Sequence, residues 1–266
     1  MKIHGTATGA AVSKKDFGVA FGGAAAADIY PDSGGSDMNI SETNCTLNTS
    51  GEILGTGCLS FNGSSAYGDC DGDPVDYNFL TQAFSLSMWV YPTITHQDIL
   101  FDSMDASTAN VGFLARFNVA GGTNKLMVGI SDGTTFEYFE TTDVWTDDEW
   151  QHLVITYNGT TMTVYRNTTS IGSGSVAKTT STPAYAPRLG WAANATDNKY
   201  EGLIDDMVLF NNRMLSSAEI SSLYNSGSGE LVSTVFAAGD RSGLKAYYNM
   251  DAIDSNVVIN NAIPTS

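Results

Sequence analysis

Short apolar runs alternate with turn sequences from about residue 40 onward. The runs include "LSFNGS", "FSLSMWVYP", "VGFLARF", "KLMVGI", "QHLVITY" and "LIDDMVLF", and turn sequences such as "GGTN", "SDGTT" and "YNGTT" separate them. In "SLSMWV" every second residue is apolar, so that one face of a strand carries Leu86, Met88 and Val90. Strands of this length and spacing predict an all-β fold, an antiparallel two-sheet sandwich of the jelly-roll type.

One segment has the pattern of a helix. In "LSSAEISSLYNSG", Ser216 and Glu219 have the spacing of a capping box, in which each side chain bonds to the backbone N–H of the other residue. Helical spacing then places on one face Ile220, Leu223 and Tyr224. Gly227 would end the helix at the C′ position, so the sequence predicts one short helix over residues 216–226.

Residues 202–210, "GLIDDMVLF", have the composition of a strand but carry two adjacent aspartates at its centre. Strict alternation would place on one face Leu203, Asp205, Met207 and Leu209. It would place on the other face Ile204, Asp206, Val208 and Phe210. Because both faces are apolar, an inward-facing carboxylate must be neutralised, hydrogen-bonded or bound to a metal.

Four segments occur in an order and at a spacing typical of a known family. They are "LSFNGSSAY" (59–67), "FSLSMWVYP" (84–92), "DEWQHLVITYNGTTMTVYRN" (148–167) and "YEGLIDDMVLFNNRMLSSAEISSLYNSG" (200–227). Together they resemble the LamG-like jelly-roll domains of the concanavalin A-like lectin/glucanase superfamily. The resemblance covers residues 40–227 and implies two stacked antiparallel sheets, with ligands bound at the concave face or at the rim loops.

The same resemblance implies a structural Ca²⁺ at the position of Asp205, with Asp206 as its neighbour. A carboxylate held by backbone N–H groups is the alternative. A second cluster of carboxylates lies in "DCDGDP", where Asp69, Asp71 and Asp73 alternate with other residues. These oxygen atoms are also candidate Ca²⁺ ligands, because calcium prefers oxygen donors. The alternative for this cluster is a solvated acidic turn.

We divide the chain into an N-terminal arm (1–38), a LamG-like jelly-roll domain (39–228) and a C-terminal extension (229–266) that carries an extra strand. Members of the family begin with a strand followed by an Asp-Ser-Gly sequence. Residues 32–34 match the second piece, but the match to the strand lies in "SGLKAYYNMDAIDSN", residues 242–256. The strand at 244–250 could close its own sandwich, pair with the sheet of a neighbouring chain, or belong to a separate appendage.

The charge of the chain limits its partners. Its 29 acidic and 12 basic residues give a net charge of −17, which disfavours binding to nucleic acid. The sequence contains neither the apolar segment of a secretory signal nor an apolar run of membrane-spanning length. We therefore expect no membrane insertion, and an extracellular or virion-surface location without a classical secretory signal.

Three cysteines, Cys45, Cys58 and Cys70, lie in the first third of the chain. The turn-rich stretches between them allow a disulfide across a hairpin for either consecutive pair, but an odd number permits only one. The alternative is three small buried thiols.

Tryptophans are the candidate platforms for stacking against a sugar ring. Trp145 and Trp191 fall near strand ends, and Trp89 lies opposite the apolar face of its strand, so these three are the predicted ligand-binding residues. A catalytic pair of carboxylates is not indicated, because Glu137 and Glu140 are three positions apart and face opposite sides of a strand.

These patterns favour a non-catalytic surface-recognition or adhesion module that binds a glycan or a protein and is stabilised by calcium. The alternative is a viral structural protein, such as a capsid-decorating, tail or filament subunit, that assembles through its terminal arms. In both cases we expect a homo-oligomer or a larger assembly. A glycoside hydrolase ranks below both.

Overall fold

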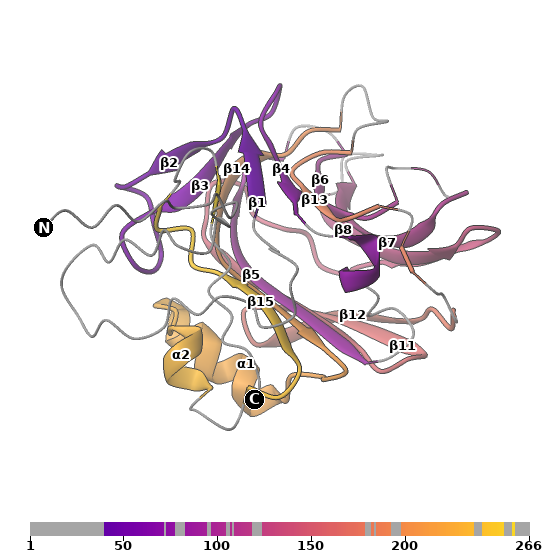
Figure 1. Ribbon diagram of the computed structural model, residues 1–266. Helices are drawn as coiled ribbons and strands as arrows, with labels where there is room; N and C mark the ends of the chain where they lie inside the picture. Colours follow the sequence, from indigo (N-terminus) through magenta and orange to yellow (C-terminus); the bar gives the residue numbers. More distant parts are fainter. Residues whose placement is uncertain are drawn as a thin grey trace, which may run out of the picture.

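The computed structural model describes residues 40–71, 73–77, 83–94, 97–104, 107, 109–118, 124–178, 182–183, 185–192, 198–236, 241–252 and 257–258. The predicted N-terminal arm lies outside these residues. The described residues form two stacked sheets of eight strands each, as the alternating sequence predicts (Figure 1). The predicted all-β sandwich is confirmed.

The first sheet, sheet A, contains strands from both ends of the described chain. Across the sheet these are β16 (Val257–Val258), β1 (Ile40–Thr43), β4 (Tyr67–Cys70), β13 (Arg188–Leu189), β6 (Ile99–Asp102), β7 (Val111–Asn118), β8 (Lys125–Asp132) and β9 (Phe136–Glu140). Each neighbouring pair is antiparallel. A short 3₁₀ helix, η2 (Pro74–Tyr77), follows β4.

The second sheet, sheet B, contains the longest strand, β14 (Glu201–Asn211), near its centre. Its order is β12 (Thr169–Ser175), β11 (Thr161–Arg166), β10 (Gln151–Tyr157), β5 (Phe84–Pro92), β14, β3 (Cys58–Asn62) and β2 (Thr46–Asn48). A further strand, β15 (Leu244–Tyr248), pairs antiparallel with the second half of β14. The C-terminal strand thus closes the sheet of its own chain, which is the first of the three alternatives for this segment.

The space between the two sheets is filled by apolar side chains from alternate positions of each strand. On β5 these are Leu86, Met88 and Val90, as the alternation predicts, and all three are buried in the main core. The cysteines are buried and free, so that three thiols rather than a disulfide are present. Burial raises the pKa of Cys45 and of Cys58 to about 12, so both stay protonated at neutral pH.

The predicted helix is α1 (Ser217–Tyr224), and its capping box is present. The Glu219 N–H donates to Ser216 Oγ at 3.3 Å, and the Ser216 N–H donates to Glu219 Oε2 at 2.7 Å. The helix ends at Asn225, which adopts the left-handed conformation, so the prediction that Gly227 ends it is wrong. Asparagine tolerates this conformation better than most residues, and a 3₁₀ turn, η3 (Asn225–Gly227), follows.

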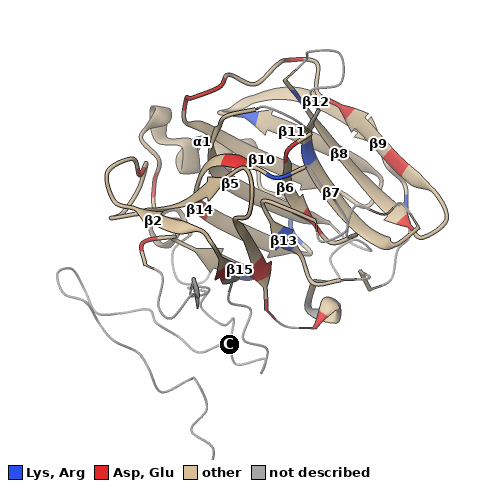
Figure 2. Ribbon diagram, turned by 90° about the horizontal axis from the view of Figure 1, so that it is seen from above, with Lys and Arg blue, Asp and Glu red and all other residues tan. Residues whose placement is uncertain are grey.

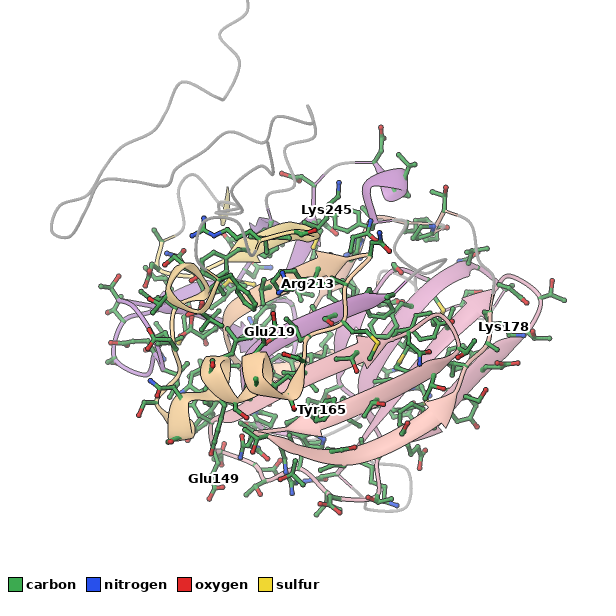
Figure 3. All side chains as sticks on the ribbon, turned by 90° about the horizontal axis from the view of Figure 1, so that it is seen from below. Glu149, Tyr165, Lys178, Arg213, Glu219 and Lys245 are labelled. Carbon is green, nitrogen blue, oxygen red and sulfur yellow. The ribbon has the colours of Figure 1, made fainter. Side chains whose placement is uncertain are left out.

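The helical segment covers the outer face of sheet B. Helix α1 and the short α2 (Val232–Val235) lie against this sheet on the side away from sheet A (Figure 1). They bury a second apolar cluster made of Val154, Val208, Phe210, Leu215, Ile220, Leu223, Val232, Phe236 and Tyr247. At its edge Arg213 pairs with Glu219 of α1 (Figure 3). In the described part of the chain no helix has the length and apolar character needed to span a membrane.

The capping box makes a specific prediction for helix stability. Ser216→Ala removes the acceptor for the Glu219 N–H, and we expect it to lower the free energy of unfolding by about 1 kcal/mol in urea denaturation. The matched control is Ser217→Ala, an exposed serine one residue further along, which should change stability little. Equal losses for the two variants would contradict the assignment of Ser216 as the cap.

Candidate functional site

The two adjacent aspartates of β14 lie on the same face of sheet B. Asp205 lies opposite Trp89 of β5, but the register then shifts so that Val208, three positions further on, lies opposite Ser87. The extra residue forms a bulge in which Asp206 has a φ of +47°. The prediction of strict alternation is therefore wrong. The bulge brings Met207 to the same core face as Ile204 and turns both carboxylates outward, toward the helical side.

Asp205 holds a neighbouring loop through backbone hydrogen bonds. Its Oδ2 accepts the N–H groups of Ile53 at 3.2 Å and Leu54 at 3.1 Å, and its Oδ1 accepts the Asp206 N–H at 2.8 Å. Asp251, beyond β15, accepts the N–H of Thr56 in the same loop. The loop between β2 and β3 is thus held by two carboxylates that lie far from it in the sequence.

Asp206 lacks this kind of support. Its side chain is only 5% exposed, and neither carboxylate oxygen has a hydrogen-bond partner of normal geometry. It faces a cavity of about 10 Å³, at the lower limit of the volume that can hold one water molecule. The other residues that line this cavity are Leu54, Ser87, Trp89, His152, Leu223, Glu230 and Val232.

Burial sets the protonation of this region. It raises the pKa of Asp206 to about 7, a rise that Tyr247 opposes and the charge of Asp251 reinforces. Burial and the charge of Asp206 also raise the pKa of Asp205 to about 8, while its three N–H donors act in the opposite direction. His152, whose Nε2 lies 2.8 Å from Ser87 Oγ, is neutral because burial lowers its pKa to about 3.

The predicted calcium ligands do not fit a calcium ion in this arrangement. Calcium takes about six to eight oxygen ligands, whereas the oxygen atoms of Asp205 already accept three N–H groups. Asp69 pairs with Arg188, and the carbonyl of Asp71 accepts the Tyr77 hydroxyl. Within the described ranges, no three or more His, Cys, Asp or Glu side chains are grouped so that they could hold a metal. Asp73 is exposed. The contacts of Asp205 match the alternative stated from the sequence, a carboxylate held by backbone N–H groups, and calcium binding at these residues is untested.

Two of the three predicted sugar platforms are buried. Trp89 is 2% exposed and stacks on Tyr224 of α1, with ring centroids 5.8 Å apart. Trp145 is also 2% exposed and packs edge-on against Phe117 in the main core. Neither indole presents a free face, so the prediction that Trp89 and Trp145 bind a ligand is wrong. The alternation in β5 places Trp89 on the face of sheet B that points away from the core, but α1 covers this face and buries the ring.

Trp191 lies instead in a half-exposed cluster on the outer face of sheet A. Its ring is 5.0 Å from that of Tyr67. The guanidinium of Arg188 lies 4.6 Å from the Tyr67 ring and 5.5 Å from the Trp191 ring, and Lys199 Nζ lies 4.9 Å from Trp191. Asp69 Oδ1 accepts Arg188 Nε at 2.5 Å. The structure thus brings Asp69 and Trp191, predicted for different roles, to one site around Arg188.

Sequence reasoning missed Arg188 and the other residues of this face. One register row crosses sheet A from its β9 edge and contains Tyr138, Gly129, Leu114, Asp102, Arg188 and Asp69. Directly opposed residues share a face, so these six positions all face away from the core. The alternation in "FEYFE" was a usable signal, because it places Phe136, Tyr138 and Glu140 on one side of β9.

The fold is a two-sheet sandwich of a known class. The chain belongs to the concanavalin A-like lectin/glucanase superfamily, whose family model matches residues 62–221. This confirms the resemblance seen in the sequence. No curated protein sequence matches the chain.

Several solved structures share the fold at low sequence identity. Domain 4 of a GH43 extracellular arabinanase from Geobacillus stearothermophilus, solved in complex with arabinotriose, is 18% identical with a TM-score of 0.50, over 67% of this chain and 80% of that one. The receptor-binding domain of botulinum neurotoxin D is 16% identical with a TM-score of 0.52, over 71% and 48%. A structure of botulinum neurotoxin type C, whose cell entry depends on two ganglioside molecules, is 15% identical with a TM-score of 0.53, over 70% and 46%. The chain spans about half the length of these neurotoxin structures.

The hydrogen bonds between Asp205 and the loop that joins β2 to β3 predict how the protein responds to metal removal. Because backbone N–H groups satisfy Asp205, we expect EDTA to leave the melting temperature unchanged. Asp205→Ala leaves the N–H groups of Ile53 and Leu54 without their acceptor and should lower the free energy of unfolding by roughly 1–3 kcal/mol. A melting temperature that falls in EDTA and recovers with added calcium would contradict this and support a bound ion.

The buried pair also predicts a dependence of stability on pH. Both carboxyl groups have folded-state pKa values above their ordinary 3.8, so the folded protein binds more protons than the unfolded chain between those values. Stability should therefore fall as pH rises from about 4 to about 8. Asp206→Asn, which carries no charge, should flatten this slope in melting experiments. Glu149→Gln, at an exposed position (Figure 3), is the control that should leave the slope unchanged.

Proposed function

We propose that the chain is a non-catalytic glycan-recognition module that binds its ligand on the outer face of sheet A. The observation that carries the proposal is the cluster of Tyr67, Arg188 and Trp191 on this face, while α1 and α2 lie against the opposite sheet. Aromatic rings pack against the apolar faces of sugar rings. Neighbouring carboxylate and guanidinium groups provide the directed hydrogen bonds that fix the orientation of a ligand.

The comparisons support the same kind of ligand. The superfamily includes lectins and glucanases, and two structures with this fold are described with arabinotriose and with gangliosides. The carbohydrates named there differ, so they support a glycan as the class of ligand rather than one sugar. Function in such folds depends on the site and not on the sandwich itself, which is why the proposal rests on the cluster around Arg188.

The arrangement of the glutamates of β9 supports the absence of glycosidase chemistry. Glu137 lies opposite Ile130, whose side chain is in the core, and its carboxylate pairs with Lys178 at 3.2 Å. Glu140 lies opposite Met127 on the outer face. A retaining pair needs carboxyl groups about 5 Å apart that flank one bond, and residues on opposite faces of a strand do not provide this.

A glycan array followed by calorimetry tests the proposal. We expect the full chain to bind at least one glycan, and Trp191→Ala to weaken that binding by about tenfold or more, the equivalent of roughly 1.4 kcal/mol. The control is Tyr165→Ala, an aromatic residue of β11 on the helical side (Figure 3), which should bind as the wild type does. Melting curves of both variants separate lost binding from lost folding. Failure to bind any glycan would contradict the proposal.

A further inference from the structure

Sheet B ends in an open edge at β12. This strand pairs with β11 alone in the described part of the chain. The Val176 N–H donates to the Thr160 C=O at 2.9 Å, which extends the β11–β12 ladder by one pair in the same register. Hydrogen-bonded pairs alternate along an antiparallel ladder, so the backbone groups of Gly174 point toward β11 and those of Ser173 and Ser175 point away from it. Among the described residues, no other backbone group bonds to the N–H or C=O of these two serines.

The edge is held in its extended shape from inside the sandwich and from one end. The Phe139 ring of β9 packs against the inner side of β12, where a Cβ atom at Gly174 would lie 2.5 Å from Phe139 Cδ1 and one at Gly172 would lie 3.1 Å from Phe139 Cε2. At the start of the strand, the Ile171 C=O accepts the Thr142 N–H at 2.8 Å and the Thr142 hydroxyl at 2.9 Å. A strand that is already ordered loses little further entropy when it pairs.

The sequence of β12 does not protect this edge from pairing with another strand. Proteins usually protect an edge by charged side chains, by proline or by a very short strand. On the same side of the sandwich, β9 at the edge of sheet A carries Glu137 and Glu140 (Figure 2). At the far edge of sheet B, β2 has only three residues. β12 has seven residues and neither charge nor proline, and its bulge at Ile171 leaves residues 172–175 in regular pairing with β11.

Charge limits where two copies of this chain can meet. The chain carries a net charge of −17, so that two copies repel each other. β12 is uncharged, and the cations that flank it are paired within the chain. Arg166 pairs with Asp143 at 3.5 Å. Lys178 pairs with Asp132 at 3.4 Å and with Glu137 at 3.2 Å. Contact through β12 therefore brings together no like charges on the strand itself.

The side chains of β12 favour a second copy over a foreign peptide as the partner. Strand addition selects a foreign peptide through pockets that receive its alternate side chains. β12 presents the small side chains of Ser173 and Ser175 beside two glycines, Gly172 and Gly174, and these residues form no such pockets. A two-fold contact needs none, because each copy supplies the same edge and the two edges are complementary to each other.

We infer that β12 pairs antiparallel with β12 of a second copy of the chain, so that sheet B of the two copies forms one continuous sheet across a two-fold axis. The outward N–H and C=O groups of Ser173 and Ser175 form the hydrogen bonds between the copies. This inference does not depend on the proposed function, and it gives a location to the homo-oligomer expected from the sequence. Because the two copies carry the same net charge, the dimer is weak at low salt and stronger at high salt.

Analytical ultracentrifugation of the full chain over a wide range of concentration, at low and at high salt, tests the inference. We expect a reversible equilibrium between monomer and dimer that shifts toward the dimer at high salt. Ser173→Pro removes the outward N–H but no bond to β11, and it should weaken dimerisation by about tenfold or more. Ser173→Asp keeps the backbone and places like charges at the contact, so it should weaken dimerisation as well. Ser173→Ala, which keeps the N–H without adding charge, is the matched control and should dimerise as the wild type does.

Hydrogen exchange locates the contact and separates it from other modes of association. In the wild type, the amides of Ser173 and Ser175 should become protected as the concentration rises, and in Ser173→Asp they should not. A chain that stays monomeric at both salt concentrations would overturn the inference and leave the edge to a foreign strand. A dimer that persists in both Ser173→Pro and Ser173→Asp, or that leaves these amides unprotected, would place the contact elsewhere. Growth beyond the dimer would overturn the two-fold arrangement, because that arrangement uses up the edge.

Discussion

The burial of both faces of β14 is the constraint on which the rest of the molecule depends. One face of this strand packs in the core between the sheets, and the other lies beneath α1 and α2. The strand pairs with β5, β3 and β15, so it also fixes the positions of its neighbours. The centre of this strand is buried, and the carboxyl group of Asp205 is accommodated there because it accepts the N–H groups of a loop whose backbone also needs partners.

The outer faces of the two sheets carry different kinds of side chain and pack against different elements. Sheet B uses its outer face to bury helices, and the tryptophan and histidine on that side pack against each other and against Tyr224. On sheet A, the outer face carries half-exposed aromatic rings and charged groups instead. A recognition surface needs a rigid base and exposed groups, and this division supplies both in one domain.

Much of the fold follows from local patterns in the sequence. The alternation in β5 and the capping box of α1 are encoded within a few neighbouring residues, so they could be predicted. The bulge at Asp206 could not, because it depends on the match between β14 and β5, which are more than one hundred residues apart. The burial of Trp89 escaped prediction for a similar reason, since only the packing of α1 closes that face.

The candidate site shows the same limit. Trp191 was found because tryptophan is rare and large, whereas Arg188 has ordinary local surroundings. Arg188 meets Asp69, Tyr67 and Trp191 only when β13 is paired with β4, and no single strand contains a signal for that contact.

The late position of β15 has a consequence for synthesis of the protein on the ribosome. β15 pairs with the second half of β14, from Met207 to Phe210. Until residues 244–248 have emerged, that edge of β14 presents unpaired N–H and C=O groups beside apolar side chains, the combination that promotes association between nascent chains. The nascent domain therefore depends on residues 244–248 to cover an edge that is prone to aggregation. Slow translation of these residues would lengthen the period during which chaperones are needed.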